Sequence, residues 1–247
     1  MLTVQSEGSV LRVTLARPDV RNAFNDELIA RLTETFSSVS EAIRIVVLSG
    51  EGKAFCAGGD LEWMRRAAAY THDENVADAM NLAGLFEAVA TCPALVLARV
   101  HGACFGGGCG LVAASDVAIA DPATLFAFSE VRLGLIAGTI SSHVIPKIGK
   151  GHARALFATG EAFDAARALT IGLVHQVGDL DVLEAATVKQ VLSVGPRAVR
   201  ESRRLVREFP LPVEECAARL AAARASDEGR EGVSAFLEKR KASFVEG

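Results

Sequence analysis

A cluster of glycines in the middle of the chain restricts the possible folds more than any other feature of the sequence. Five of the ten residues of "HGACFGGGCG", from His101 to Gly110, are glycine, and Gly106, Gly107 and Gly108 are consecutive. Glycine weakens both helices and strands. A cluster of this kind therefore needs a local reason, such as a sharp turn or the close approach of a ligand or a second backbone.

A second glycine segment of the same type lies about fifty residues earlier. "AFCAGGD" follows the β-branched run "IRIVVLSG", just as the first segment follows "ALVLARV". Each is predicted to connect a buried strand to a helix, whose first amides lack intrahelical partners and favour negative charge. Two such loops side by side can direct two N–H groups at one oxygen and form an oxyanion hole. The alternative is close packing of strand against helix with no ligand.

Other glycine motifs do not fit these segments. The spacing matches neither G-x-x-x-x-G-K-[ST] nor G-x-G-x-x-G, and G-x-S-x-G is missing, which excludes the common phosphate loops and the nucleophile elbow. The five cysteines include no C-x-x-C pair and the histidines no H-E-x-x-H motif. We therefore expect buried thiols, with neither a disulfide framework nor a metal site.

Predicted strands and helices alternate up to about residue 145, and the rest is mostly helical. This pattern predicts an α/β core with a helical appendage. The balance of 26 basic and 30 acidic residues argues against a nucleic-acid partner. No stretch is apolar for long enough to span a membrane, and the first residues do not resemble a secretory signal, so we expect a cytoplasmic protein.

The segments "VVLSGEGKAFCAGGDLEWM", "PALVLARVHGACFGGGCGLVAASDVAIADPATLFAFSEVRLGLIAG" and "GEAFDAARALTIGLVHQV" resemble successive signatures of the enoyl-CoA hydratase/isomerase (crotonase) superfamily. With "ARPDVRNAFNDELIARL", they cover roughly residues 10 to 178. Within the superfamily the sequence is most similar to bacterial methylglutaconyl-CoA and carboxygeranoyl-CoA hydratases.

The resemblance implies a crotonase-like spiral of ββα repeats with a C-terminal all-helical region that forms trimers. We place the core that binds acyl-CoA at residues 1–190 and the oligomerisation region at 191–247. It also implies an acyl-CoA substrate, a homo-trimer or dimer of trimers, and no cofactor apart from the coenzyme A carried by the substrate.

The resemblance further assigns candidate site residues. The N–H groups of Gly59 and Gly107 match the oxyanion-hole positions, next to Gly106. Coenzyme A is expected along two short segments and one lysine, which comprise Arg21 to Ala23, Lys53, and Ala57 to Leu61 with Gly58 and Asp60. Many family members carry a lysine where this chain has Glu62. The remaining candidate phosphate partners are Arg65, Arg66 and Lys239 to Lys241, the last from a neighbouring subunit.

Hydratases of this family use two glutamates to add water. The downstream one is present as Glu130 in "FAFSEVRLG", but Gly110 occupies the position of the other. Glu130 alone could activate water, or a carboxylate of the substrate could fill the space at Gly110. A Δ3,Δ2-isomerase and a 3-hydroxyacyl-CoA hydrolase also fit one glutamate. A non-catalytic member that binds coenzyme A or RNA is a further alternative, which the acidic balance and the retained Glu130 disfavour. Ser141, Ser142 and His143 are too close in sequence to form a nucleophile–base pair.

Overall fold

The strands of the chain form two sheets. A computed structural model describes residues 1–246. Within these residues, the larger sheet contains, in spatial order, β1 (Leu2–Glu7), β2 (Val10–Leu15), β3 (Ile45–Gly50), β5 (Leu95–Val100), β7 (Val117–Ala120) and β10 (Gln176–Val177). The smaller sheet contains, in order, β4 (Ala54–Cys56), β6 (Ala103–Phe105), β8 (Leu125–Ala127) and β9 (Ala162–Asp164). All neighbouring strands are parallel except the β1–β2 and β8–β9 pairs.

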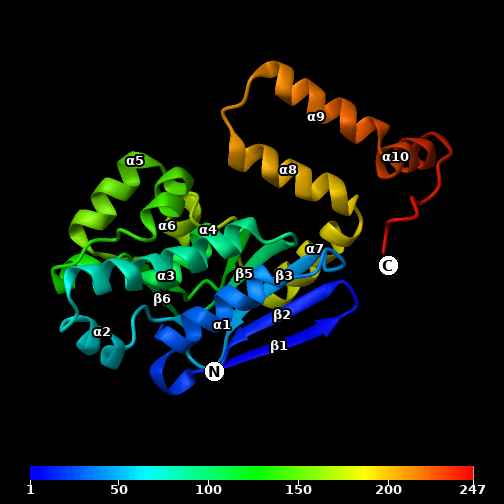
Figure 1. Ribbon diagram of the computed structural model, residues 1–247. Helices are drawn as coiled ribbons and strands as arrows, with labels where there is room; N and C mark the ends of the chain where they lie inside the picture. Colours follow the sequence, from blue (N-terminus) through cyan, green and yellow to red (C-terminus); the bar gives the residue numbers. More distant parts are fainter. Residues whose placement is uncertain (247) are drawn as a thin grey trace.

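The chain gives one strand to each sheet and then forms a helix, and it repeats this step three times (Figure 1). The pair β3–β4 precedes α2 (Leu61–Ala67) and α3 (His72–Thr91), and the pair β5–β6 precedes α4 (Gly107–Ala114). The pair β7–β8 precedes the 3-10 helix η2 (Glu130–Leu133) and α5 (Ser141–Thr159). The 3-10 helix η1 (Pro18–Val20) and α1 (Asp26–Ser37) follow β2, and α6 (Ala165–Thr170) joins β9 to β10. The predicted spiral of ββα repeats is confirmed.

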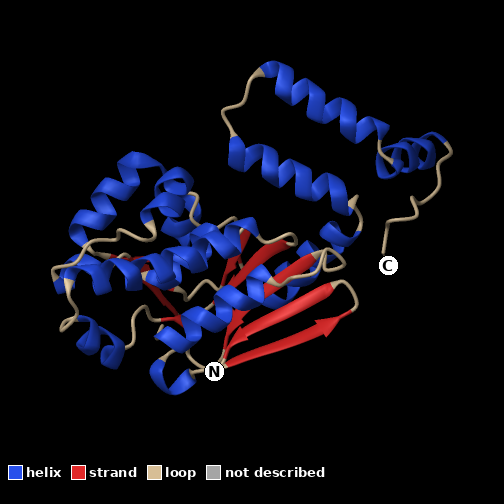
Figure 2. Cartoon of the chain, viewed as in Figure 1, coloured by secondary structure: helices blue, strands red, loops and turns tan. Residues whose placement is uncertain are grey.

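Helices cover both faces of the larger sheet, as the continuous apolar character of "IRIVVLSG" predicts. Val46 and Leu48 of β3 face the main core with α1, whereas Ile45 and Val47 belong to a smaller cluster with Leu180 of α7 (Leu180–Leu192). Figure 2 shows the helices (blue) arranged around the strands (red). The sheet is therefore a rigid base from which the loops after its strands extend.

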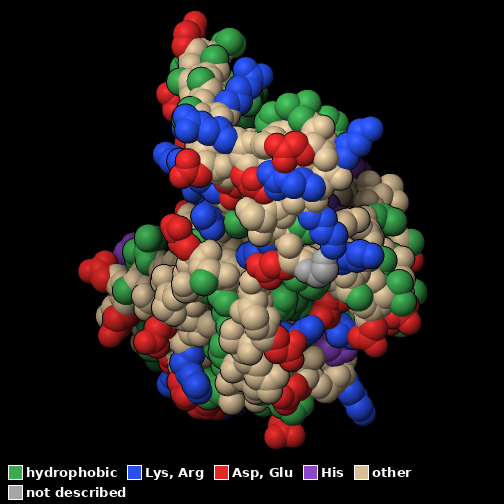
Figure 3. All heavy atoms as spheres, turned by 90° about the vertical axis from the view of Figure 1, so that its right-hand side faces the viewer, with side chains coloured by type: hydrophobic (Ala, Val, Ile, Leu, Met, Phe, Trp, Pro, Cys, Tyr) green, Lys and Arg blue, Asp and Glu red, His purple; other side chains and the backbone are tan. Residues whose placement is uncertain are grey.

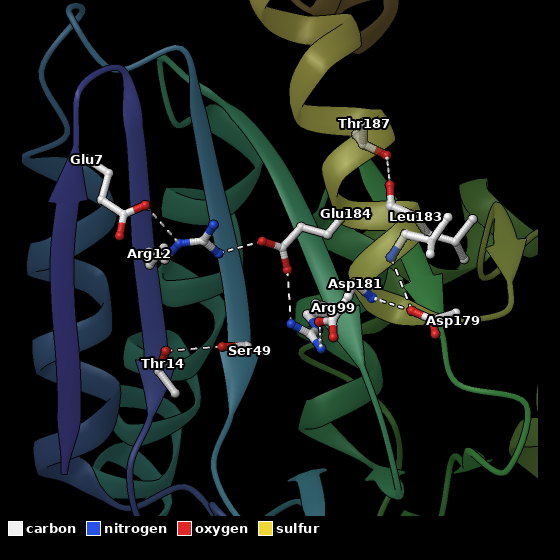
Figure 4. A network of polar contacts seen from close by, with 11 residues as sticks. Glu7, Arg12, Thr14, Ser49, Arg99, Asp179, Asp181, Leu183, Glu184 and Thr187 are labelled. Carbon is white, nitrogen blue, oxygen red and sulfur yellow. Dashed lines mark hydrogen bonds and ion pairs between the residues drawn. The ribbon is translucent and has the colours of Figure 1, made fainter.

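An ion-pair network fixes α7 to the outer face of this sheet (Figure 4). Glu184 of α7 is buried between Arg12 of β2 and Arg99 of β5, and Arg99 also contacts Asp181. Because Glu184 is buried, its charge would be uncompensated only if both arginines were lost, whereas loss of one leaves the other in place. This network fixes the helix that connects the core to the C-terminal region.

The C-terminal region consists of α8 (Pro196–Glu208), α9 (Val213–Ala225) and α10 (Asp227–Leu237), which project from the body of the molecule (Figure 1). The Arg44 guanidinium donates to the carbonyls of Val191 at 2.9 Å and Phe244 at 2.7 Å. Arg203 of α8 is paired with Asp116 at 2.7 Å. The helical run begins at Leu180 of α7, before residue 191, and Gly247 lies outside the described residues. No helix among residues 1–246 is both long and apolar enough to cross a membrane.

Candidate active site

The two glycine loops and Glu130 meet at one edge of the smaller sheet. Strands β4, β6 and β8 are parallel neighbours, so their carboxyl ends lie side by side. The loop after β4 contains Gly59, β6 leads into Gly107, and Glu130 follows β8. A Cβ atom placed on Gly106 would lie 3.3 Å from Glu130 Oε1 and 3.9 Å from Gly58 Cα. The fold therefore brings together three segments that are 23 to 71 residues apart in sequence.

The N–H of Gly59 is not used by the protein itself. The residues on both sides of Gly59 form backbone hydrogen bonds with Phe24: Phe24 N donates to Gly58 O at 2.7 Å, and Asp60 N donates to Phe24 O at 2.8 Å. Within residues 1–246, the amide between them has no acceptor. Gly59 is partly exposed, so this N–H can donate to an oxygen of a bound molecule.

Gly107 offers the second N–H, at the first position of α4. Gly106 makes the turn from β6 with φ +50°, a conformation that favours glycine, and its N–H donates to Ala127 O at 2.9 Å. The first amides of a helix have no intrahelical acceptor, and the N–H of Gly107 has none elsewhere among the described residues. The positive end of the helix dipole lies at the same point.

Close packing also requires glycine at Gly107 and Gly108. A Cβ atom at Gly107 would lie 2.7 Å from the Phe24 ring, and one at Gly108 would lie 2.6 Å from Cys56 O. A side chain at Gly108 would push α4 away from β4, and one at Gly107 would push it away from Phe24. The packing explanation and the oxyanion explanation therefore apply to the same loop, because the close approach is what aligns the free N–H groups.

Glu130 is the acidic side chain that faces these loops. Its Oε2 atom is buried without a hydrogen-bond partner among the described residues. Burial raises the pKa of Glu130 above its usual value, opposed by a hydrogen bond from its own backbone N–H. The nearby Arg132 donates to Gly160 O at 2.9 Å and does not neutralise the carboxylate. A carboxylate with a raised pKa and a free oxygen is suited to proton transfer near neutral pH.

No space is left at Gly110 for a second carboxylate. A Cβ atom there would lie 2.5 Å from Ile140 Cγ2 and 2.7 Å from Phe86 Cε1. Ile140 or Phe86 would therefore have to shift before a glutamate could replace Gly110. That a carboxylate of the substrate lies in this part of the site stays a prediction. Glu130 remains the candidate acid–base group.

The Ser141–His143 segment forms no nucleophile–base pair in the structure. Ser141 Oγ donates to Gly138 O at 2.7 Å, and the ring of His143 packs edge-on against Phe86. Burial lowers the pKa of His143. This arrangement agrees with the expectation from sequence that these adjacent residues do not act together.

The segments expected to bind coenzyme A surround the Gly59 loop. Arg21 and Lys53 are exposed, and the Arg21 carbonyl accepts from Ala57 N at 3.0 Å. Ala23 is buried, and its carbonyl accepts from the Arg17 guanidinium. Both exposed cations are free to approach a phosphate. Ala23 can contribute only its backbone groups to the binding of coenzyme A.

Asp60 and the remaining cations have structural partners. Asp60 caps α2 by accepting from Glu62 N at 2.8 Å and pairs with Arg17 at 2.8 Å. Although burial opposes it, these bonds lower the pKa of Asp60. Leu61 is 76% exposed at the start of α2. Among the other candidate phosphate partners, the structure pairs three with carboxylates: Arg65 with Glu62, Arg66 with Asp26, and Arg240 with Glu231 and Glu238.

Sequence reasoning missed two residues that hold these loops in place. Asn22 is fully buried at φ +56°, and its side chain donates to Glu51 O at 2.9 Å and Ala54 O at 2.8 Å. Its Oδ1 accepts from Arg17 N, while the Arg17 side chain reaches Ala23 and Asp60. Asparagine tolerates this left-handed backbone. The only sequence signal was an Arg-Asn pair after a proline, which indicates a turn.

Two free N–H groups beside a buried carboxylate suit the class of protein that stabilises negative charge on a carbonyl oxygen during proton transfer. The sequence matches the profile of the Enoyl-CoA hydratase/isomerase family over residues 5–247. The Crotonyl-CoA hydratase of Syntrophomonas wolfei is 30% identical over 99% of this chain and 97% of its own length.

Solved structures agree with this match. An enoyl-CoA hydratase of Shewanella pealeana is 35% identical with a TM-score of 0.94, covering 98% of this chain and 95% of its own. An enoyl-CoA hydratase/isomerase of Marinobacter aquaeolei is 33% identical with a TM-score of 0.93, covering 99% of both chains. The chain therefore belongs to the enoyl-CoA hydratase/isomerase family.

Removal of the Gly59 N–H tests whether it acts on the substrate. We expect Gly59→Pro to lower kcat by about 10²–10³-fold, the usual effect of losing one oxyanion donor. Gly59→Ala keeps the N–H and is the matched control; its Cβ would lie 3.3 Å from the Trp63 ring, so this ring must shift by a few tenths of an ångström. Steady-state kinetics of both variants, with circular dichroism to verify folding, provide the measurement. Equal activity of the proline and alanine variants would remove Gly59 from the oxyanion hole.

Glu130→Gln should also change the pH dependence of stability. Because burial raises the pKa of Glu130 in the folded state, ionisation of this group costs stability as pH rises from the ordinary glutamate value through the folded value. Below the ordinary value both states are protonated and the cost disappears. We therefore expect the variant to have a higher Tm than the native protein at pH 7 and an equal Tm near pH 4. A Tm difference that does not change with pH would contradict the burial of this charge.

Proposed function

We propose that the protein adds water across the 2,3 double bond of an enoyl-CoA thioester. The observation that carries this proposal is the unpartnered Oε2 atom of Glu130 beside the two glycine loops. The family match supports the substrate class, because the matching relatives include enoyl-CoA and crotonyl-CoA hydratases.

One carboxylate is sufficient to balance the protons. Glu130 takes a proton from water as the water oxygen bonds to C3, and the electron pair of the double bond moves onto the thioester oxygen. The N–H groups of Gly59 and Gly107 stabilise this enolate. Glu130 then returns the proton to C2. The reaction requires no cofactor other than the coenzyme A of the substrate.

Exposed cations and backbone groups suit the coenzyme A part of the substrate. Arg21 and Lys53 are placed to pair with its phosphates, and the backbone of Ala23 and Ala57 to Leu61 lies along the same path. For the acyl part, the resemblance to methylglutaconyl-CoA and carboxygeranoyl-CoA hydratases favours a branched or carboxylated chain.

An absorbance assay tests the proposal directly. The purified protein is incubated with crotonyl-CoA and with methylglutaconyl-CoA, and the enoyl absorbance and free thiol are followed together. Hydration removes the absorbance without releasing thiol, whereas a 3-hydroxyacyl-CoA hydrolase releases thiol from hydroxyacyl-CoA. Failure to hydrate or dehydrate any of several substrates would overturn the proposal.

The closed position at Gly110 favours one second candidate, a Δ3,Δ2-enoyl-CoA isomerase. Isomerisation moves one proton between C4 and C2, so a single carboxylate serves as both base and acid. A 3-enoyl-CoA substrate distinguishes the two. An isomerase converts it to the conjugated 2-enoyl-CoA, whose absorbance rises and persists, whereas a hydratase leaves 3-enoyl-CoA unchanged.

We propose that the protein works in the cytoplasm as a homo-trimer or a dimer of trimers. Its C-terminal helices expose large apolar side chains, namely Val206 (77%), Phe209 (71%), Val213 (79%), Phe236 (82%) and Leu237 (73%). Figure 3, which faces this side, shows hydrophobic surface (green) among charged groups on the projecting part. Such surface is typical of a subunit interface. A monomeric mass by light scattering would contradict this part of the proposal.

A further inference from the structure

Lys147 lies at the opposite end of α4 from Gly107. Its side chain extends from α5 to the C-terminal end of α4, where Nζ donates to Ser115 O at 2.7 Å, Val112 O at 3.1 Å and Ala113 O at 3.4 Å. The last carbonyls of a helix have no intrahelical donor, so this ammonium satisfies them. Lys147 belongs to α5, so a side chain from a different helix binds these three carbonyls of α4 and the residue after it.

Helix α4 depends on such support. It has eight residues, three of which are glycine, and glycine is one of the least favourable residues in a helix. No side chain caps its first turn. The helix is held by tertiary packing, with Gly108 to Ala114 all buried. A fixed cation at the C-terminal end therefore limits how far the N-terminal amides can move.

The same cation also acts on the oxyanion hole through its charge. Eight residues at 1.5 Å per residue separate Nζ from the first amide by about 12 Å. At an effective dielectric constant of about 20, one unit charge at this distance stabilises an opposite unit charge enough to change an equilibrium constant or a rate by about tenfold. The positive charge has the sign that stabilises an enolate.

We propose that Lys147 is a positioning residue for catalysis, which holds α4 by its C-terminal carbonyls and strengthens the positive end of the helix at Gly107. This inference rests on the proposed function. Lys147 touches no reacting atom, and it acts on the substrate only through α4.

The charged groups around Lys147 set its behaviour with pH. Burial lowers the pKa of Lys147 to about 8, and the nearby Asp116 opposes this shift. Asp116 is itself paired with Arg203 of α8. His143 and His175 face the same region, and the pKa of each is lowered by burial, with Lys147 contributing. Below a pH of about 8, Lys147 is therefore the charged group next to these carbonyls. Above that pH it loses its charge.

The test compares Lys147→Met with Lys147→Arg and with Lys150→Met, an exposed control three residues further along α5, just beyond its break at Gly149. Activity of the native protein and its loss in Glu130→Gln first establish the proposed function, so that its failure is distinguished from failure of this inference. At pH 7 we expect Lys147→Met to lower kcat by about tenfold with KM within twofold. Lys147→Arg should restore most of kcat, and Lys150→Met should equal the native protein.

A measurement on the native protein covers the case in which Lys147→Met does not fold. Its kcat should fall by about tenfold between pH 7 and 9.5, with the midpoint near 8 and with Tm still above the assay temperature. A folded Lys147→Met variant with native kcat overturns the proposal. If Lys147→Met does not fold, the proposal is overturned by a kcat of the native protein that stays constant between pH 7 and 9.5.

Discussion

Glu130→Gln is expected to lower kcat by about 10³–10⁴-fold without loss of folding. General acid–base catalysis by one positioned group contributes about 10²–10⁴-fold to the rate. We expect the upper part of this range for Glu130, because this one carboxylate carries out both proton transfers. Glutamine keeps the size of the side chain but cannot take the proton from water. The assay is hydration of crotonyl-CoA under saturating substrate, so that kcat is measured separately from binding.

The matched control is Glu34→Gln, on the exposed face of α1. This change makes the same chemical substitution away from the glycine loops, and we expect native kcat. KM of Glu130→Gln should change little, since the oxyanion donors remain. If Glu130→Gln instead retained native turnover, another group would have to supply both protons, and the single-carboxylate mechanism would be wrong.

Gly110→Glu is expected to prevent folding. Its first side-chain carbon would already lie 2.5 Å from Ile140, and its carboxylate would be buried against Phe86 with no partner. Overpacking and an unpaired buried charge together cost more than about 5 kcal/mol, which is comparable with the whole stability of many domains. The measurement is the soluble yield, with Tm for any protein recovered.

Gly110→Ala separates the steric effect from the charge. It adds one methyl group to the same crowded position, and we expect a loss of about 1–3 kcal/mol in a folded protein. A Gly110→Glu variant that folds and gains activity on crotonyl-CoA would show that Phe86 and Ile140 move aside. In that case the second carboxylate position would be accessible after all.

The alternation of strand and helix in the core, and the position of Glu130 after a strand, could be read from the sequence. The long apolar runs at 45–50 and 95–100 are strands in the structure because both of their faces are buried. The two extended pieces on either side of Asp121-Pro122 are indicated by the sequence and are β7 and β8, but the second strands of the first two turns were not predicted. β4 and β6 have three residues each, too few for an alternating pattern, and they border glycine turns. Without these strands the second sheet, which brings the loops together, could not be predicted.

The surroundings of Gly110 and Lys147 are determined by residues far away in sequence. Phe86 of α3 and Ile140 before α5 fill the space next to Gly110, and neither belongs to a local motif. Lys147 gives no signal as an isolated lysine in a helix, because its partners are backbone carbonyls of another helix. Tertiary contacts of this kind can be identified only once the strands and helices are placed relative to each other.

The glycine content of α4 also has a consequence for the order of folding. Short helices rich in glycine do not form alone in water, because nucleation is costly and each glycine adds to that cost. The contacts that stabilise α4 come from Phe24, Cys56, Phe86 and Ile140, which span more than a hundred residues of chain. The aligned amides therefore form late, after distant segments have assembled, and non-local contacts of this kind are slow to close. Until Phe86 and Ile140 are in place, the N–H group of Gly107 has no fixed direction and cannot hold an enolate.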